Sequence, residues 1–364
     1  MKILGIESSC DETAASVVED GKRLLSNVVN SQIDIHAVYG GVVPEIAARS
    51  HIEAVNPAIE QALKEADCTW DDIDAIAVTY APGLIGSLLV GTLAARTLAI
   101  LKNKPLFPIH HVEAHVYANF ITEQGPGVAS ANLMLPSKQP SFPMLALIVS
   151  GGHTQLVLFK DHGDYELLGQ TQDDAVGEAF DKVAKIIGLP YPGGVSIDRA
   201  APNGNRKAFP LPKAKLQGAY DFSFSGLKTA VLRAVQREVG KDITFPSHEL
   251  PALLNDVQRN DFAASFQKVA IETLVDKAVK AYEDFLPASV VIAGGVAASD
   301  ALRRELSERL PIAIEYAPMK LCTDNAAMIA TLGYYQAQHL EPCDPYTLEV
   351  MPSISMTKTA WARK

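Results

Sequence analysis

The chain uses the same local pattern twice, at two places far apart in the sequence. Residues 2–7 and 14–19 are two β-prone runs joined by the polar turn Ser8–Thr13. Residues 145–160 (LALIVSGGHTQLVLFK) again give a strand, a glycine-containing polar turn and a strand. Two units that each open on a hairpin with a polar or glycine-rich tip are typical of two lobes closing around phosphate groups. The sequence therefore predicts a duplicated fold.

The segments between and after these hairpins favour the α/β class. A helical stretch is expected around 43–66, followed by an apolar strand at 73–80 and a helix at about 86–102. A third glycine turn, at 290–299 (VVIAGGVAAS), follows a strand and precedes a helix, as a loop that approaches a nucleotide does. A single turn of this kind is usually only a turn, but three together favour nucleotide binding.

A chain of 364 residues exceeds what one hydrophobic core usually supports, so two lobes are expected. We place the first lobe at 1–125 and the second, nucleotide-binding lobe at 144–337. The connection at 126–143 is rich in proline and small polar residues. A helix at 325–338 is expected to pack back on the first lobe, and the tail at 338–364 receives no function.

The net charge of −10 argues against a protein that coats nucleic acid indiscriminately. A basic stretch is nevertheless present at 199–241, which contains nine basic residues and only two acidic ones. It is either a solvated surface or a contact for a phosphate backbone. The basic residues are Arg199, Arg206, Lys207, Lys213, Lys215, Lys228, Arg233, Arg237 and Lys241.

The cysteines and the N-terminus indicate a cytoplasmic protein. The four cysteines form no CxxC pair, which argues against a disulfide framework and against a thiolate zinc site. Charges appear too early in the N-terminal sequence for a signal peptide, and no apolar run is expected to reach the length of a membrane span. The cysteines are Cys10, Cys68, Cys322 and Cys343.

Two histidines one helical turn apart suggest a metal site. Residues 110–120 (HHVEAHVYANF) read as a helix, which places His111 and His115 on one face. The pair alone leaves open whether it is a metal site or an ordinary pair of surface or core residues. Glu113 lies about 200° around the helix from His111, not about 100° as in the zinc-protease motif HExxH, so a peptidase is disfavoured.

A metal held by two histidines needs an oxygen ligand from elsewhere, and Asp324 is a candidate. This residue stands between a predicted strand and an alanine-rich helix. An aspartate in that position is also a common helix N-cap. Its place in the sequence does not distinguish the two roles.

Together these stretches resemble the bacterial type of the tRNA N6-adenosine threonylcarbamoyltransferase family, once described as sialoglycoprotein endopeptidases or glycoproteases. The resemblance covers nearly the whole chain. Its motifs are GIESSCDETAASVV (5–18), HAVYGGVVPEIAARSHIEAV (36–55), YAPGLIGSLLVG (80–91), HHVEAHVYA (110–118), LIVSGGHTQL (147–156), GEAFDKVAKIIGLPYPGG (177–194), DFSFSGLKTAV (221–231), AGGVAAS (293–299) and CTDNAAMIA (322–330).

The resemblance implies a two-lobed actin-like ATPase (ASKHA) fold with duplicated ribonuclease H-like domains. The implied reaction moves a threonylcarbamoyl group from threonylcarbamoyl-AMP to N6 of the adenosine 3′ to the anticodon, in tRNAs that read codons beginning with A. His111, His115 and Asp324 correspond to the ligands of one divalent metal ion, iron or alternatively zinc. The implied partners are tRNA, a paralogous actin-like subunit and a small P-loop ATPase.

The resemblance also implies a binding site for the adenylate in the second lobe. Ser299 departs from the family, because many members have asparagine there, and a hydroxyl offers fewer hydrogen bonds than an amide. No general base stands out, and Glu12 and His153 are only weak candidates. The implied contacts are Ile148, Val149, Ser150, Gly151, Gly152, Asp181, Gly194, Asp198 and Ser299.

Two other functions remain open on the sequence. Sugar and acetate kinases share the actin-like fold, so a phosphotransferase with a small substrate is the first alternative. A nucleotide-gated scaffold for partner proteins, with the histidine pair as a relic, is the second. A kinase would turn over ATP without tRNA, whereas the transferase requires tRNA.

Overall fold

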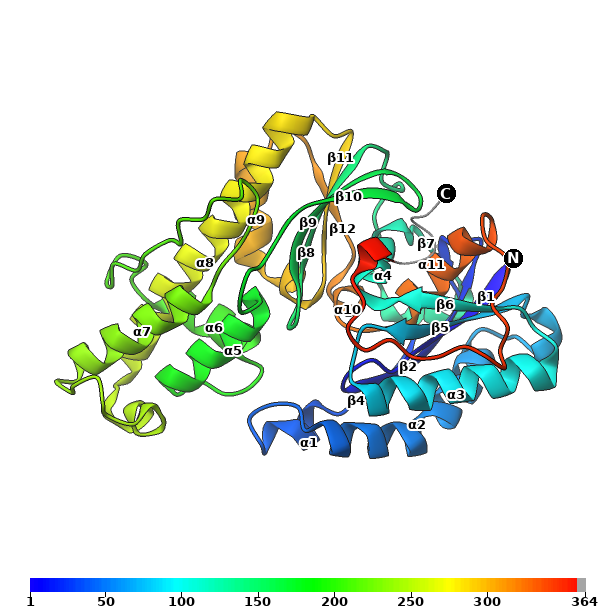
Figure 1. The fold of residues 1–364 in the computed structure, drawn as a ribbon, viewed down its shortest axis with the longest axis horizontal. Coiled ribbons are helices and arrows are strands. Elements are labelled where there is room, and N and C mark those ends of the chain that lie inside the picture. The colour runs from blue at the N-terminus through cyan, green and yellow to red at the C-terminus, as the bar shows by residue number, and fades with distance from the viewer. Residues whose placement is uncertain (359–364) are drawn as a thin grey trace.

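The computed structural model describes residues 1–358, and residues 359–364 of the predicted tail lie outside the described residues. The described chain is built around two β-sheets, one of seven strands and one of five, with helices packed on each (Figure 1).

The first sheet contains the N-terminal hairpin and two parallel neighbours. Its strand order is β6-β5-β1-β2-β3-β7, with β4 also paired to β2. Strand β1 pairs antiparallel with β2 and parallel with β5, which in turn pairs parallel with β6. The strands are β1 (Lys2–Glu7), β2 (Glu12–Glu19), β3 (Arg23–Leu24), β4 (Val28–Ser31), β5 (Ala75–Ala81), β6 (Leu106–His110) and β7 (Glu123–Gln124).

The second sheet repeats this scheme. Its order is β10-β9-β8-β11-β12, and β8 pairs antiparallel with β9 and parallel with β11. Strand β8 therefore takes the place of β1, and β11 and β12 take the places of β5 and β6. The predicted duplicated, actin-like α/β fold is confirmed. The strands are β8 (Met144–Val149), β9 (Thr154–Asp161), β10 (Asp164–Gln170), β11 (Ser289–Ala293) and β12 (Ile314–Tyr316).

Helices cover both faces of the first sheet, because successive side chains of β1 point to opposite sides. Leu4 and Ile6 lie in the core with α2 and α3, whereas Ile3 belongs to the core on the other face. On that other face α11 packs so closely that a Cβ on Gly5 would lie 2.3 Å from the carbonyl oxygen of Ala326. The helices are α1 (Ile33–Ala37), α2 (Pro44–Glu65), α3 (Ile85–Lys102), α4 (His111–Tyr117) and α11 (Ala326–Ala337).

The second lobe carries the remaining helices, and Figure 1 shows α8 as the long helix beside its sheet. One continuous apolar core includes this lobe together with α4 and α11, so the two lobes are packed together through these helices. The helices are α5 (Val176–Ile187), α6 (Gly193–Ala200), α7 (Ser225–Glu238), α8 (Asp256–Phe285), α9 (Asp300–Arg309) and α10 (Met319–Cys322).

Helix α3 corrects one expectation. By length and composition it is apolar enough to cross a membrane, although the sequence was expected to contain no such run. In this fold it packs against α2 and β5, and leucine and isoleucine side chains remain on its outer face. The expectation was wrong because α3 has apolar residues on its outer face as well as on the face that packs against the core, which makes the whole helix apolar.

Candidate metal and nucleotide site

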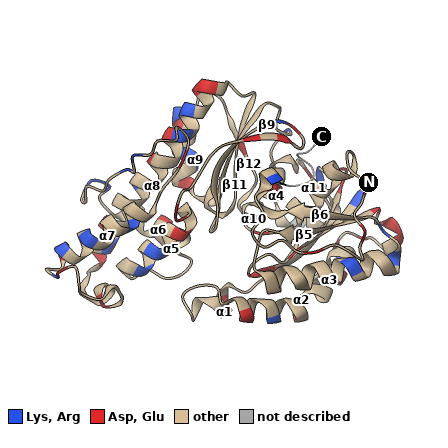
Figure 2. Cartoon of the chain, viewed as in Figure 1, with Lys and Arg blue, Asp and Glu red and all other residues tan. Residues whose placement is uncertain are grey.

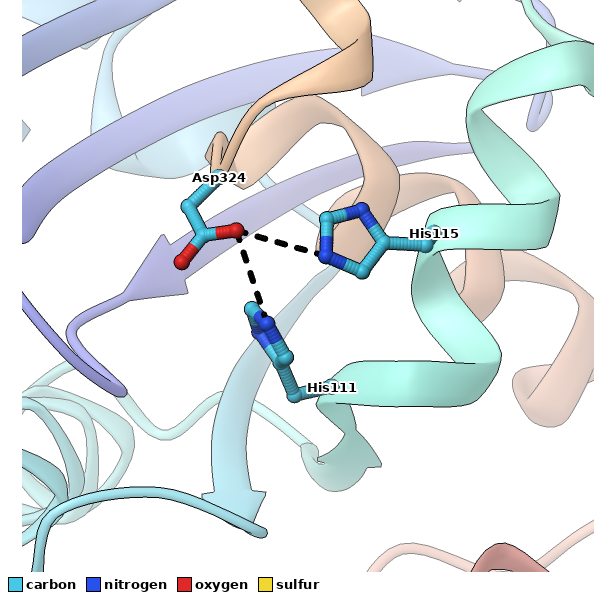
Figure 3. Close-up of side chains that lie close together, drawn as sticks. All are labelled: His111, His115 and Asp324. Carbon is cyan, nitrogen blue, oxygen red and sulfur yellow. Dashed lines mark ion pairs between the residues drawn. The ribbon is translucent and has the colours of Figure 1, made fainter. Parts of the chain in front are cut away.

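Strand β6 and helix α4 meet without a loop, so the first candidate metal ligand, His111, follows the strand directly. His111 begins α4 and His115 lies one turn later, with ring centroids 4.7 Å apart. Figure 3 shows both rings turned towards Asp324. The distance from Asp324 Oδ1 to the Nε2 atom is 3.5 Å for His111 and 3.3 Å for His115. One potential ligand atom from each residue lies within 4.8 Å of the others.

The ambiguity about Asp324 is resolved by its neighbour. Asn325, not Asp324, is the N-cap of α11, and its Oδ1 accepts a hydrogen bond from the Met328 N–H at 3.1 Å. The Asn325 amide also donates to the carbonyl oxygens of Leu321 and Thr323. The carboxylate of Asp324 is therefore left to face the two histidines.

These three side chains fit a divalent metal ion. Within the described residues, the buried Nδ1 of His115 has no hydrogen-bond partner, and the buried Nε2 has only its 3.3 Å ion-pair contact with Asp324 Oδ1. Burying an unpaired polar atom is costly, so an imidazole in this state is suited to a ligand bond. Two imidazoles and one carboxylate form a donor set that suits iron or zinc and leaves coordination positions open for substrate.

A carboxylate that the sequence analysis missed orients the first histidine. Nδ1 of His111 lies 3.0 Å from Glu7 Oε2 and 3.2 Å from the Ser9 hydroxyl. Glu7 ends β1 and also accepts hydrogen bonds from the Thr79 hydroxyl and the Ser9 N–H. With the Nδ1 proton directed to Glu7, Nε2 keeps its lone pair for a metal. The available signal was a lone acidic residue at the end of the apolar run KILGIE.

The charges in this group support one another. Burial would raise the pKa of Asp324, but His111 and His115 hold it well below its ordinary value. Burial would lower the pKa of His111, but the carboxylates of Asp324 and Glu7 raise it to about 9. Burial likewise opposes ionisation of Glu7, and His111 keeps its pKa below the usual value. Without a metal, a protonated His111 therefore lies between two carboxylates at neutral pH, and a bound cation would take the place of its Nε2 proton.

Glu113 does not serve this group as a protease glutamate would. Its side chain is fully buried, and Oε2 accepts a hydrogen bond from the Tyr165 hydroxyl on β10 at 3.2 Å. This carboxylate joins α4 to the second lobe, in agreement with the orientation that the helix geometry predicted.

The predicted nucleotide residues of the second hairpin occupy its tip. Ile148 and Val149 end β8 with their side chains in the core, so they can meet a ligand only through their backbone. Ser150 closes the turn, with its N–H donating to the His153 carbonyl at 2.8 Å. Nothing lies within 4 Å of a Cβ placed on Gly151 or Gly152, so both approach open space.

Helices α5 and α6 carry the two predicted aspartates. Asp181 Oδ1 accepts a hydrogen bond from the Gly193 N–H at 2.7 Å, and Gly194 faces open space. Asp198 Oδ1 lies 3.0 Å from the Ser299 hydroxyl, which donates to it, and also accepts a hydrogen bond from Gln267. In this chain the Ser299 hydroxyl therefore helps to orient the carboxylate of Asp198.

The two weak candidates for a general base differ in protonation. Burial, reinforced by Asp324 and Asp11, raises the pKa of Glu12 to about 10, so this carboxyl keeps its proton at neutral pH. Burial and the neighbouring His111 and His115 lower the pKa of His153 to about 4, so this imidazole is neutral. Of these two groups, only the imidazole can therefore take up a proton at neutral pH.

The duplicated sheets, with glycine turns in the second lobe and a cluster that joins His111 and His115 of the first lobe to Asp324, define a two-lobed protein of the actin-like ATPase class. A crystal structure of full-length HypF in the phosphate- and nucleotide-bound form shares the fold, with TM-score 0.54 and 13% identity over 92% of this chain and 46% of that one.

Within this class, the chain belongs to the tRNA N6-adenosine threonylcarbamoyltransferase family, whose model matches residues 23–331. It is 50% identical over 345 residues to the protein of that name from Thermomicrobium roseum, and the aligned region covers 93% of this chain and 92% of the relative. It is 52% identical over 336 residues to the one from Symbiobacterium thermophilum, with 92% and 91% covered.

Proposed function

We propose that this chain transfers the threonylcarbamoyl group of threonylcarbamoyl-AMP to N6 of the adenosine 3′ to the anticodon, in tRNAs that read codons beginning with A. Its relatives carry the name of this transferase. The observation that carries the proposal is the convergence of His111, His115 and Asp324, which lie near enough to His153 of the second hairpin turn to influence its pKa. The reaction belongs in the cytoplasm, where tRNA is modified.

In this proposal His111, His115 and Asp324 hold one divalent ion, iron or alternatively zinc. When bound, the ion supplies Lewis-acid polarisation of an oxygen of the adenylate. The chain's own groups do the remaining work of orientation. Glu7 fixes the ring of His111, and the peptide N–H groups at Gly151 and Gly152 can approach a phosphate closely because neither residue has a side chain.

The chemistry of the transfer needs one nucleophile and one leaving group. The N6 lone pair forms a bond to the carbamoyl carbon, and the bond from that carbon to the phosphate oxygen breaks with its electron pair leaving on AMP. We assign Asp181 and Asp198, which accept hydrogen bonds from Gly193 and Ser299, a further role as acceptors for hydroxyl groups of the substrate. We assign the proton released by N6 to His153, because Glu12 already carries a proton.

We assign tRNA to the basic stretch at 199–241. Figure 2 shows basic residues recurring along α7. Three of the nine basic side chains are engaged with carboxylates: Arg206 with Glu305, Lys213 with Glu272 and Asp276, and Lys228 with Asp174. The other six make no ion pair within residues 1–358, so they are the ones available to phosphates. They are Arg199, Lys207, Lys215, Arg233, Arg237 and Lys241.

We assign the paralogous actin-like subunit to the outer face of α2 and α3. Isolated apolar residues on a surface are ordinary, but here several occur on two packed helices. Replacing Leu89 and Leu93 by aspartate should abolish co-elution with that subunit and leave the fold intact. The small P-loop ATPase is a further proposed partner without an assigned surface. The exposed side chains are Ile52, Ile85, Leu89, Leu93 and Leu101.

The test of this function is tRNA modification with chemically made threonylcarbamoyl-AMP, with and without the partner proteins. We expect the modified adenosine to form only when this chain, the adenylate and the tRNA are all present. Turnover of ATP with a small hydroxyl or carboxyl substrate, in the absence of tRNA, would instead identify a kinase. Failure of both reactions would favour the scaffold.

A further inference from the structure

The C-terminal segment 343–356 runs back over the first lobe as an extended strap (Figure 1). It begins beside β6, where the Cys343 N–H donates to the Leu106 carbonyl at 2.9 Å. The guanidinium of Arg96 on α3 then holds it. Its three nitrogens donate to the carbonyl oxygens of Pro345, Leu348 and Tyr346 at 2.5, 3.2 and 2.7 Å.

The strap next crosses the carboxyl end of β5. The Met351 N–H donates to the Tyr80 carbonyl at 2.9 Å, and the Gly83 N–H donates to the Pro352 carbonyl at 3.1 Å. These contacts lead the chain to the edge of the sheet at which β6 passes into the metal-ligand helix α4. The strap is thus tied along its length by backbone groups of the first lobe.

At that edge the strap determines the tautomer of His110, the residue just before the ligand His111. Nε2 of His110 lies 3.1 Å from the Ile354 carbonyl oxygen, which can only accept a hydrogen bond, so Nε2 carries the proton. Nδ1 is then the acceptor, and it receives the Glu113 N–H at 3.5 Å as the N-cap of α4. The strap carbonyl therefore selects the tautomer that caps the helix.

The strap ends on a residue that joins the two lobes. The Tyr165 hydroxyl on β10 lies 2.7 Å from the carbonyl oxygen of Met356, and this methionine side chain is buried. The same hydroxyl lies 3.2 Å from Glu113 Oε2, between the two metal-type histidines in sequence. Helix α4 is consequently held at its N-cap, His110, by the strap and at Glu113 by the tyrosine that the strap contacts.

We propose that residues 343–356, anchored by Arg96, are a positioning strap that holds α4 in the orientation in which His111 and His115 meet Asp324. The inference rests on the proposed metal role of these residues and extends it. The strap residues are positioning residues, because none of them is one of the metal ligands. Without the strap, His110 loses the carbonyl that fixes its capping tautomer and Tyr165 loses its contact with Met356, so the two ligands on α4 meet the ion with less preorganisation.

The test is the affinity for Zn²⁺, measured by competition with a chromophoric chelator at a temperature where every variant is folded by circular dichroism. Arg96→Met removes the anchor, Tyr165→Phe removes the inter-lobe link, and a chain ending at Glu341 removes the strap. We expect affinity to fall about tenfold or more for Arg96→Met and the shortened chain, and by a smaller factor for Tyr165→Phe.

Matched controls are Arg304→Met on α9 and a chain ending at Lys358, which keeps the strap contacts made within residues 1–358; both should bind Zn²⁺ like the full chain. Co²⁺ absorption provides a second readout, because its d–d bands report ligand geometry, and they should change in Arg96→Met. If the shortened chain does not fold, the two point variants decide. Unchanged affinity and unchanged Co²⁺ bands in Arg96→Met and Tyr165→Phe would overturn the strap. Failure of the full chain to bind metal would instead remove the proposed metal role.

Discussion

Oε2 of Glu7 lies 3.0 Å from Nδ1 of His111, and this contact joins the first hairpin to the metal-ligand helix. Glu7 is held in turn by Thr79 at the end of the neighbouring strand β5. The side chain that presents Nε2 to Asp324 is therefore oriented by the central strands of the first sheet. A change in Glu7 should consequently act on metal binding more than on folding.

Glu7→Gln should lower Zn²⁺ affinity by about tenfold to a hundredfold, because outer partners of a metal-bound histidine typically contribute that much. The amide keeps the shape of the carboxylate but loses its charge and can present the wrong group to Nδ1. Chelator competition measures the effect. Glu166→Gln, which changes an exposed carboxylate on β10, is the control. Equal affinities for Glu7→Gln and the parent chain would refute the assignment.

Substitutions at two glycines of the proposed nucleotide turns should have different effects, one on ligand binding and the other on stability. A Cβ at Gly151 meets nothing within 4 Å, so Gly151→Ala should leave the free energy of unfolding nearly unchanged and weaken adenylate binding. Gly294 has φ +90° and its Cβ would lie 2.5 Å from the Val149 carbonyl oxygen, so Gly294→Ala should destabilise the fold by more than about 1 kcal/mol.

Urea unfolding and equilibrium binding of a non-hydrolysable adenylate analogue measure the two effects. The reverse pattern, with a destabilised Gly151→Ala that binds normally, would show that the hairpin tip faces protein and not ligand.

Ser299 should act through Asp198. Its hydroxyl donates to Asp198 Oδ1 at 3.0 Å, so Ser299→Ala leaves that carboxylate with the amide of Gln267 as its remaining hydrogen-bond partner among the described residues. We expect a several-fold rise in KM for the adenylate and little change in kcat, as for a lost ground-state contact. Ser299→Asn, the residue common in the family, should restore KM. An effect of Ser299→Ala confined to kcat would contradict this role.

His162 should make stability depend on pH in the acid range. Its ring stacks on Tyr335 with centroids 4.0 Å apart and lies 3.1 Å from the Tyr117 hydroxyl. Burial lowers its pKa to about 4. An unfolded histidine has a pKa of about 6.5, so between about pH 6.5 and about pH 4 the unfolded chain binds more protons.

The contribution of His162 to stability is therefore complete above about pH 6.5 and is lost as the pH falls towards 4. His162→Phe keeps an aromatic ring in the cluster and should reduce the slope of unfolding free energy against pH in this window. Urea unfolding at several pH values gives the slope, with the exposed His248→Gln as control. An unaltered slope in His162→Phe would mean that the imidazole is not protected from protonation.

Much of this architecture was predictable because it depends on local patterns. The two hairpins and the helices around 43–66 and 86–102 follow from hydrophobic period and turn residues, and they appear as β1–β2, β8–β9, α2 and α3. The i, i+4 spacing likewise places His111 and His115 on one face of α4. Local patterns are enough where one element carries the whole feature.

Features that depend on contacts between residues far apart in the chain could not be predicted from local sequence patterns. Asp324 could be named as a candidate but its role could not be assigned, because no local signal distinguishes a ligand from an N-cap, and the cap is in fact Asn325. Glu7 was missed because its partner lies about a hundred residues away. The strap was missed because its contacts use backbone carbonyl oxygens, which every residue possesses.

We predict that transfer from the adenylate to tRNA needs a metal ion bound by His111, His115 and Asp324. The direct test uses metal-stripped protein, chemically made threonylcarbamoyl-AMP and tRNA, and measures the modified adenosine before and after stoichiometric Fe²⁺ or Zn²⁺ is added. We predict almost no product from stripped protein, recovery with one equivalent of metal, and no recovery in His115→Ala. Full product formation by metal-free protein, or by His115→Ala without bound metal, would contradict the account.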